Sequence, residues 1–278
     1  MDHHLHYAVI DIHRVTAFCG SSCVFRDFSL TLEAGSSIAI IGPNGSGKTT
    51  LMKLLSHDLY PVADPGSHIR IFGKEQWNVW DLRTRLGIVS HDLQHNYLSG
   101  AGGIQVILSG IYASIDTWQN QQFSTADLQK AEAIMENLGI GALKHRAFGA
   151  MSTGQQRRCL LGRALINNPE ALLLDEPTTG LDLRSTFQYI ETLRQLLKSG
   201  KTVILVTHHI HEIPPEIQRV VLIKEGRIVN DGNKVDVLTS KSLSDLFDYS
   251  LQVISLNGYF QVVPDTEDST FMRTTVNF

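Results

Sequence analysis

The stretch GPNGSGKT at residues 42–49 decides how this chain folds. It matches the pattern G-x-x-x-x-G-K-[ST], and it lies between an apolar run at residues 37–41 and an apolar-periodic stretch at residues 51–55. A strand, a glycine-rich loop and a helix in this order turn backbone N–H groups toward an anion, and the positive end of the helix dipole adds to the attraction. The sequence therefore predicts a phosphate-binding loop.

Two side chains of this loop have distinct expected roles. Lys48 is expected to reach the β- and γ-phosphates of a nucleotide, and the Thr49 hydroxyl is expected to bind Mg²⁺. The candidate phosphate-contacting residues of this segment are Gly42, Pro43, Asn44, Gly45, Ser46, Gly47, Lys48, Thr49 and Thr50.

A second candidate site follows the apolar run at residues 171–174, where Asp175 and Glu176 stand side by side. Asp175 is expected to hold Mg²⁺, directly or through water, and Glu176 to polarise an attacking water molecule. Two acids that end a strand in solvent are the alternative. The presence of Lys48 in the same chain favours the catalytic interpretation.

Composition indicates an ordinary globular protein, because the 278 residues are 42% hydrophobic and 19% charged. The net charge of −4 gives no indication of nucleic-acid binding. Cys19, Cys23 and Cys159 form no C-x-x-C pair, so we expect reduced thiols in a cytosolic protein. No apolar run approaches the roughly 20 residues that span a bilayer, so any role at a membrane is expected to depend on a partner.

Short apolar runs at residues 38–41, 86–90, 171–174 and 202–206 are typical of parallel strands buried on both faces. Helical segments lie between them, and this alternation predicts an α/β fold with a mostly parallel sheet that binds ligands at the carboxyl ends of its strands. Residues 7–16 are predicted to form an edge strand, and residues 28–32 a second strand before the phosphate loop.

Two further segments depart from the alternating pattern. Helical periodicity at residues 104–108 and 127–138, with Ser124 or Thr125 as a cap, predicts a helical insertion over about residues 92–150. Beyond residue 232, a short helix and a hairpin turning at Asn257-Gly258 predict a small C-terminal extension over residues 233–278.

The motifs of this chain, taken in order, resemble the nucleotide-binding domain of ATP-binding-cassette (ABC) proteins over about residues 7–232. The signature of that family, usually L-S-G-G-Q, has its counterpart in MSTGQ at residues 151–155. The loop TGLD at residues 179–182 is similar to the family's D-loop, and His208 stands where the family has its switch histidine. The resemblance implies a P-loop NTPase (RecA-like) core with an antiparallel β subdomain.

The resemblance also implies a working cycle in which two such domains close head to tail and trap ATP with Mg²⁺. Each ATP lies between the phosphate loop of one chain and the signature of the other. The residues implied for contact with ATP across this seam are Ser152, Gly154, Gln155 and Asp182. The resemblance makes Glu176 and His208 the catalytic residues.

Three further positions follow from the resemblance. Phe18 lies where the family places an aromatic ring that stacks on adenine, although Phe18 could equally belong to the core. The family's sensor glutamine normally follows the strand expected at residues 86–90. Here the direct register favours His91, whose charge would vary near neutral pH, and Gln94 is the rival.

We therefore expect a Mg²⁺-dependent ATPase subunit of a membrane transporter. It would form a homodimer or pair with a homologous cassette, and it would lie in the cytoplasm on the inner face of a membrane beside a separate transmembrane permease. The alternative is a soluble single-cassette ATPase that regulates a complex without transport. One phosphate loop and one signature in the chain favour the transporter subunit.

Overall fold

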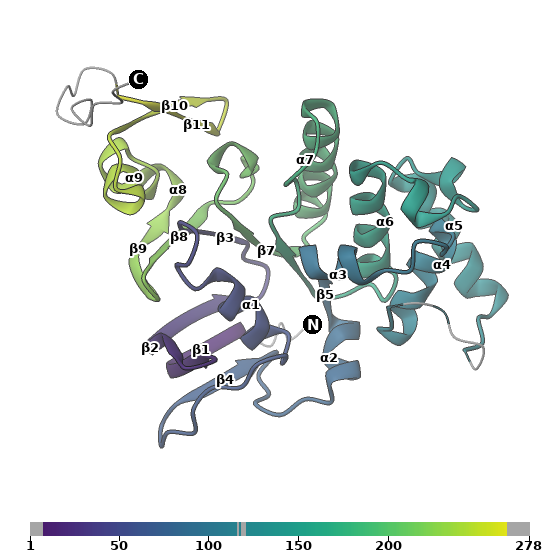
Figure 1. The fold of residues 1–278 in the computed structure, drawn as a ribbon, viewed down its shortest axis with the longest axis horizontal. Coiled ribbons are helices and arrows are strands. Elements are labelled where there is room, and N and C mark those ends of the chain that lie inside the picture. Colours follow the sequence, from purple (N-terminus) through teal and green to yellow (C-terminus); the bar gives the residue numbers. More distant parts are fainter. Residues whose placement is uncertain (1–7, 116, 118–120, 266–278) are drawn as a thin grey trace, which may run out of the picture.

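A six-stranded sheet forms the centre of the computed structural model, which describes residues 8–115, 117 and 121–265 (Figure 1). Its strands lie in the order β5-β6-β7-β3-β8-β9, and every neighbouring pair is parallel except β8 and β9. Their bounds are β5 Leu86–Val89, β6 Ala171–Asp175, β7 Thr202–Thr207, β3 Ile38–Ile41, β8 Arg219–Lys224 and β9 Arg227–Asn233. The expected α/β fold with a mostly parallel sheet is confirmed.

Both faces of this sheet are buried, because successive side chains of a strand point to opposite sides. In β3, Ile38 and Ile40 belong to one apolar core, and Ala39 and Ile41 belong to the other. The continuous apolar runs of the sequence thus supply two cores at once.

A three-stranded antiparallel sheet with the order β2-β1-β4 covers one of these cores. It consists of β1 Ala8–Cys19, β2 Ser22–Glu33 and β4 His68–Ile71, and helix α1 (Lys48–Leu55) packs between the two sheets. The prediction of an edge strand at residues 7–16 is wrong, since β1 pairs with β2 on one side and β4 on the other; residue 7 lies outside the described residues.

Helices cover the other core and extend away from the sheet toward the right of Figure 1. Ser124 caps α5, since its Oγ accepts a hydrogen bond from the backbone N–H of Asp127, and the capping choice between Ser124 and Thr125 is thereby decided. These helices are α3 His91–Asn96, α4 Gly103–Leu108, α5 Thr125–Asn137, α6 Thr153–Leu165 and α7 Leu183–Lys198, with 3-10 turns at Ser109–Tyr112, Gly141–Leu143 and Phe148–Ala150. Helix α2 (Val79–Arg85) instead buries Leu82 in the core that the antiparallel sheet covers.

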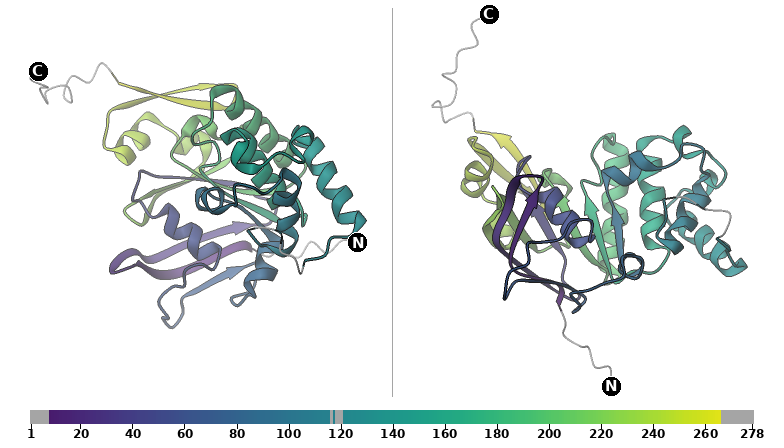
Figure 2. Two further views of the ribbon diagram at one scale, coloured as in Figure 1. Left: turned by 45° about the vertical axis from the view of Figure 1, so that its right-hand side comes forward. Right: turned by 60° about the horizontal axis from the view of Figure 1, so that its bottom comes forward.

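The C-terminal part consists of α8 (Lys234–Val237), α9 (Ser240–Phe247) and a hairpin of β10 (Leu251–Leu256) and β11 (Tyr259–Pro264). Asn257 and Gly258 both have positive φ, 52° and 80°, as a tight two-residue turn requires. In Figure 1 and in the right-hand view of Figure 2 the hairpin lies at the upper left and the α4–α6 helices lie at the right, and both contribute side chains to the same apolar core. Residues 266–278 of the expected extension lie outside the described residues.

Lys234, which is buried, connects this hairpin to the rest of the molecule through hydrogen bonds. Nζ of Lys234 donates hydrogen bonds to the carbonyl oxygens of Pro214 and Pro215, both at 3.2 Å, and of Gly258 at 3.1 Å. β11 also packs against the 3-10 turn Ile210–Glu212 that follows β7. Within the described ranges, no helix is both long and apolar enough to cross a bilayer.

Candidate functional site

The loop between β3 and α1 contains two glycines, Gly42 and Gly47, at which any added side chain would clash. Gly47, the N-cap of α1, has φ 108°, and a Cβ there would lie 2.9 Å from the ring of Phe25. A Cβ on Gly42 would lie 2.3 Å from the carbonyl oxygen of Ile223 in β8. The loop therefore lies close to β8 of the central sheet at one end and to β2 of the antiparallel sheet at the other.

Lys48 folds back over this loop. Its Nζ donates hydrogen bonds to the carbonyl oxygens of Gly42 at 2.7 Å and Pro43 at 3.0 Å. Burial lowers the pKa of Lys48, and the negative charges of Glu176 and Asp175 oppose that shift. The ammonium thus lies within the field of both acids, which come from a distant part of the sequence.

Asp175 and Glu176 stand at the carboxyl end of β6. Burial and the neighbouring charge of Glu176 raise the pKa of Asp175 to about 6. Glu176 has φ 44°, the left-handed region that residues other than glycine avoid. Strain of this kind is typical of functional sites, where the surrounding structure imposes it.

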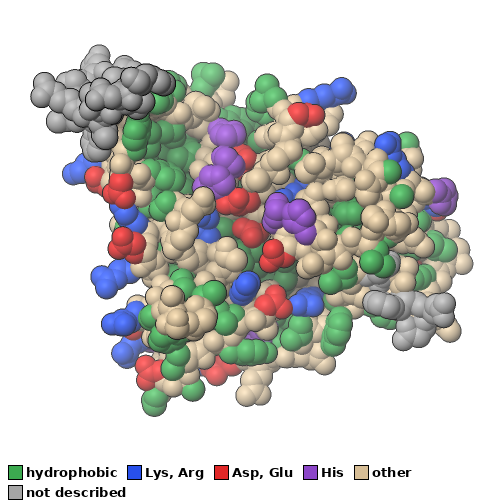
Figure 3. All heavy atoms as spheres, in the orientation of Figure 1, with side chains coloured by type: hydrophobic (Ala, Val, Ile, Leu, Met, Phe, Trp, Pro, Cys, Tyr) green, Lys and Arg blue, Asp and Glu red, His purple; other side chains and the backbone are tan. Residues whose placement is uncertain are grey.

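Histidines surround these acids. Nδ1 of His208, just after β7, lies 2.6 Å from Oε1 of Glu176. The rings of His208 and His209 are tilted by 40° with their centroids 3.9 Å apart, and the centroids of His209 and His211 are 5.6 Å apart. On the face shown in Figure 3, histidine side chains lie beside a central group of carboxylates.

The residues at this edge fit a triphosphate with a magnesium ion. Oγ of Ser46, inside the glycine loop, is buried and has no hydrogen-bond partner among the described residues, as expected of a group that awaits a ligand. Mg²⁺ keeps few protein ligands when it binds phosphates. The described residues contain no cluster of three or more His, Cys, Asp or Glu side chains that could hold a metal ion.

The signature residues form a second group. Ser152 caps α6: its Oγ accepts from the backbone N–H of Gln155 at 3.3 Å, and Oε1 of Gln155 accepts from the N–H of Ser152 at 3.0 Å. A Cβ on Gly154 would lie 2.9 Å from Ser185, whose N–H donates to Asp182 at 2.6 Å. Signature and D-loop are therefore neighbours. Among the described residues, no hydrogen bond or ion pair joins them to the phosphate loop.

His91 and Gln94 lie on the short helix α3, not in a loop. His91 is largely exposed, and its ring lies 4.4 Å from that of His95. Partial desolvation of the ring and the charge of Arg157 lower the pKa of His91, and Asp92 and then Glu176 oppose the shift. Nε2 of Gln94 instead donates to Oε1 of Gln156 in α6 at 2.7 Å. Thus His91 lies within the field of the acids, and Gln94 connects α3 to α6.

Phe18 lies near the end of β1 with 41% of its surface exposed. The possibility that Phe18 belongs to the core is therefore wrong. Its ring is available at the surface, which the expected stacking on adenine requires.

Arg157 is a residue of this region to which sequence reasoning assigned no role. Its side chain is fully buried, and its charge acts on Asp175, Glu176 and Tyr189. The sequence does contain an indication that Arg157 is buried. Arg157 stands three residues after Gly154 and four before Leu161, and this spacing places all three on one buried face of the helix.

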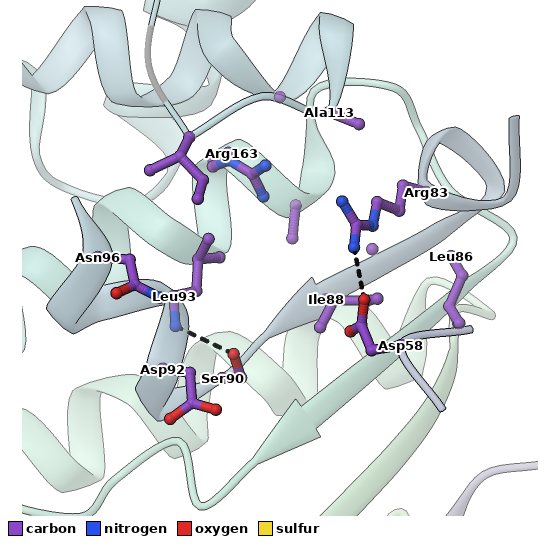
Figure 4. A pocket seen from close by; sticks show the side chains of 14 residues that line it. Asp58, Arg83, Leu86, Ile88, Ser90, Asp92, Leu93, Asn96, Ala113 and Arg163 are labelled. Atoms are coloured by element: carbon purple, nitrogen blue, oxygen red, sulfur yellow. Dashed lines mark hydrogen bonds and ion pairs between the residues drawn. The ribbon is translucent and has the colours of Figure 1, made fainter. Parts of the chain in front are cut away.

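A pocket of about 190 Å³ lies between the sheet and the helices (Figure 4). In the figure, Ser90 accepts a hydrogen bond from the backbone N–H of Leu93 at 3.2 Å, and Arg83 pairs with Asp58 at 2.9 Å. The lining residues include Asp58, Arg83, Ile88, Leu93, Ala113 and Arg163. The strand β5, the helices α3 and α6 and the segment after α4 thus all contribute to the lining of this pocket.

Comparison with known proteins finds the same family along most of the chain. The sequence model of the family described as "ABC transporter" matches residues 25–179. An uncharacterized ABC transporter ATP-binding protein of Bacillus subtilis, YlmA, is 29% identical over 88% of this chain and 93% of its own length. The phosphonates import ATP-binding protein PhnC 2 of Nostoc is 33% identical over 81% of this chain and 93% of its own length.

A solved structure shares the fold. It is the dimeric structure of a post-hydrolysis state of the ATP-binding cassette MJ0796 bound to ADP and phosphate. The likeness has a TM-score of 0.68 and 24% identity, and it covers 81% of this chain and 98% of the other.

Proposed function

The chain belongs to the ABC transporter family as an ATP-binding subunit, and from this premise we propose that it hydrolyses ATP between two cassettes to drive a separate membrane permease. The observation that carries the proposal is the convergence of Lys48, Asp175 and the Glu176–His208 pair at one edge of the sheet. Ligands of α/β proteins bind at this edge, beyond the carboxyl ends of the strands.

The phosphate loop holds the triphosphate in this proposal. The loop residues 42–50 turn toward the phosphates, and the ammonium of Lys48 exchanges its carbonyl partners for phosphate oxygens. Phe18 stacks on the adenine. Thr49 and Asp175 are the protein ligands of Mg²⁺, which neutralises charge on the phosphates.

Glu176 is the base in this proposal. Its carboxylate accepts a hydrogen bond from the water that attacks the γ-phosphorus, and the strained backbone at φ 44° directs that carboxylate toward His208. His208 orients Glu176 and contacts the γ-phosphate. His91 or Gln94 detects the γ-phosphate from α3 and passes the change to the helices.

A second cassette completes the site. Ser152, Gly154, Gln155 and Asp182 lie together at the starts of α6 and α7, without a hydrogen bond to the phosphate loop of their own chain in the described residues. This separation supports their acting on the triphosphate of a partner copy or a homologous cassette. The dimeric state of the related cassette MJ0796 gives the arrangement a precedent.

The pocket of Figure 4 supplies the connection to the permease in this proposal. The pocket is lined by residues of β5, α3 and α6. A permease segment bound in it would therefore be displaced by any movement of α3 and α6. We assign residues 1–232 to the cassette, with the helical part at about 92–150, and residues 233–278 to the C-terminal extension. The subunit would act on the cytoplasmic face of a membrane.

A regulatory role without transport is the other candidate. The relatives are named as transporter proteins, one of them an importer of phosphonates, and these names do not favour it. The transported substance is a separate question, because nothing in the ATP site selects it.

Co-purification combined with ATPase assays tests the proposal. The wild-type chain is expected to hydrolyse ATP, to dimerise with Mg²⁺ and a slowly cleaved ATP mimic, and to be recovered from membranes with an integral partner. Recovery in a water-soluble complex alone would favour the regulatory role. A chain that stays monomeric with the mimic, even beside a homologous cassette, contradicts the shared seam.

A further inference from the structure

The guanidinium of Arg157 is buried without a partner. The residue is 0% exposed, and its Nε, Nη1 and Nη2 atoms have no hydrogen bond to any described residue. A buried cation that has lost its hydration shell without gaining hydrogen bonds destabilises the folded state. Stability alone therefore does not explain why α6 carries an arginine here.

Groups on three other elements interact electrostatically with this guanidinium. The charges of Asp175 and Glu176, at the end of β6, act on this guanidinium, and so does Tyr189 in α7. The charge of Arg157 also reaches His91 in α3. The hydroxyl of Tyr189 is likewise buried without a hydrogen-bond partner among the described residues. Arg157 thus lies at the junction between the acid pair and the helices.

Arg163, another buried arginine of α6, shows how a buried guanidinium is usually stabilised, namely by hydrogen bonds. Nε and Nη2 of Arg163 donate to the carbonyl oxygen of Ser114 at 3.3 and 2.9 Å. Arg163 is 9% exposed, so burial on α6 does not by itself prevent hydrogen bonding. Of these two buried arginines of α6, only Arg157 lacks a hydrogen-bond partner among the described residues.

The helix links Arg157 to the signature. Ser152 caps α6 and Gly154 lies in its first turn, so Arg157 stands less than two turns away on the same helix. A helix moves as a rigid unit over this distance. Any shift of the signature toward a triphosphate therefore moves the guanidinium relative to Asp175 and Glu176.

We propose that Arg157 is a positioning residue for ATP hydrolysis, which holds the Asp175–Glu176 pair in its working arrangement and gains hydrogen bonds to it when nucleotide draws α6 toward the sheet. The proposal rests on the proposed ATPase function. Nucleotide binding thus supplies the hydrogen bonds that the guanidinium lacks among the described residues. Arg157 touches neither the phosphates nor the attacking water.

Thermal unfolding of Arg157→Met and Arg163→Met makes a matched test. Without nucleotide, Arg157→Met is expected to unfold at the same or a higher temperature than the wild type, because an unpaired buried charge is removed. Arg163→Met is expected to unfold at a lower temperature, because the Ser114 carbonyl loses its donor. With Mg²⁺ and a slowly cleaved ATP mimic, the wild type should gain more in unfolding temperature than Arg157→Met.

Steady-state kinetics supply the second readout. Arg157→Met is expected to lower kcat about tenfold while the KM for ATP changes less than about twofold. Arg157→Lys should recover part of the rate, because it returns the charge.

Three results would overturn the inference. One is a loss of stability in Arg157→Met equal to that in Arg163→Met, with unchanged kcat per folded molecule. Another is an equal gain in unfolding temperature from the ATP mimic in wild type and Arg157→Met. A third is a parallel loss of ATP affinity and kcat, which would mean that the guanidinium binds nucleotide. If the wild type itself neither binds nor hydrolyses ATP, the proposed function fails instead, so the two failures are distinguishable.

Discussion

Nδ1 of His208 lies 2.6 Å from Oε1 of Glu176, at the ends of the neighbouring strands β7 and β6. The pairing of Asp175 with Val206 in the sheet brings the two side chains to the same edge. A base that is already oriented by a histidine needs little reorganisation before it acts on water.

Glu176→Gln should separate nucleotide binding from cleavage. The amide keeps the shape of the side chain but accepts no proton, so we expect hydrolysis to fall by about 10²-fold or more while ATP affinity changes little. A nucleotide-bound dimer should accumulate, as measured by light scattering after size exclusion. Glu225→Gln, in the exposed turn between β8 and β9, is the control. Hydrolysis by Glu176→Gln at the wild-type rate would show that another group is the base.

Lys48→Ala should weaken ATP binding by about tenfold or more, because a charge that faces the phosphates is lost. Fluorescent-nucleotide titration measures the effect. Lys53→Ala, on the exposed face of the same helix, removes a charge without altering the loop and serves as the control. Equal affinities of Lys48→Ala and wild type would rule out the proposed role of the ammonium.

His91→Ala and Gln94→Ala should differ in their effect on hydrolysis. His91 lies within the field of Glu176, whereas the amide of Gln94 is bonded to Gln156. We expect His91→Ala to lower the ATPase rate about tenfold and Gln94→Ala to retain most of it. The reverse order, in an assay at saturating ATP, would make Gln94 the sensor.

Asp175→Asn should stabilise the nucleotide-free protein at high pH. The raised pKa of about 6, against an ordinary value of 3.8, means that folding favours the protonated carboxyl. This stabilisation is fully present below pH 3.8 and is lost as the pH rises through about 6. Relative to wild type, the variant should gain roughly 1–2 kcal/mol at pH 8, a figure reduced for the partial solvent exposure of the site.

Urea unfolding at several pH values checks this sign. The difference between Asp175→Asn and wild type should shrink steadily toward pH 4. A difference that is constant with pH would mean that the titration of Asp175 is not coupled to folding.

Lys234→Met should loosen the C-terminal hairpin. The three carbonyls of Pro214, Pro215 and Gly258 would lose their donor, so we expect a loss of about 1–3 kcal/mol in the free energy of unfolding. Hydrogen exchange of β10 and β11 should accelerate more than exchange in β3. Lys241→Met, at an exposed position of α9, is the control. Unchanged exchange in the hairpin would mean that apolar packing alone holds it.

Much of the fold could be predicted because its signals are local. The glycine loop, the buried strands and the Asn257-Gly258 turn each depend on residues that are close in sequence. The position of β1 could not be predicted in this way. Its strand pattern was visible, but its second neighbour, β4, comes after the phosphate loop and α1, and pairing over that distance leaves no periodic signal.

The amino-acid sequence by itself determined the phosphate loop, the acid pair and the order of the motifs, because each is a short run of residues with its own chemistry. Only the tertiary structure decided that Asp175 is buried enough to raise its pKa, that Lys234 fastens the hairpin, and that Arg157 lies unpaired beside the acids. The physical reason is that burial and charge–charge interactions depend on which groups packing brings together, and local patterns do not encode those distances.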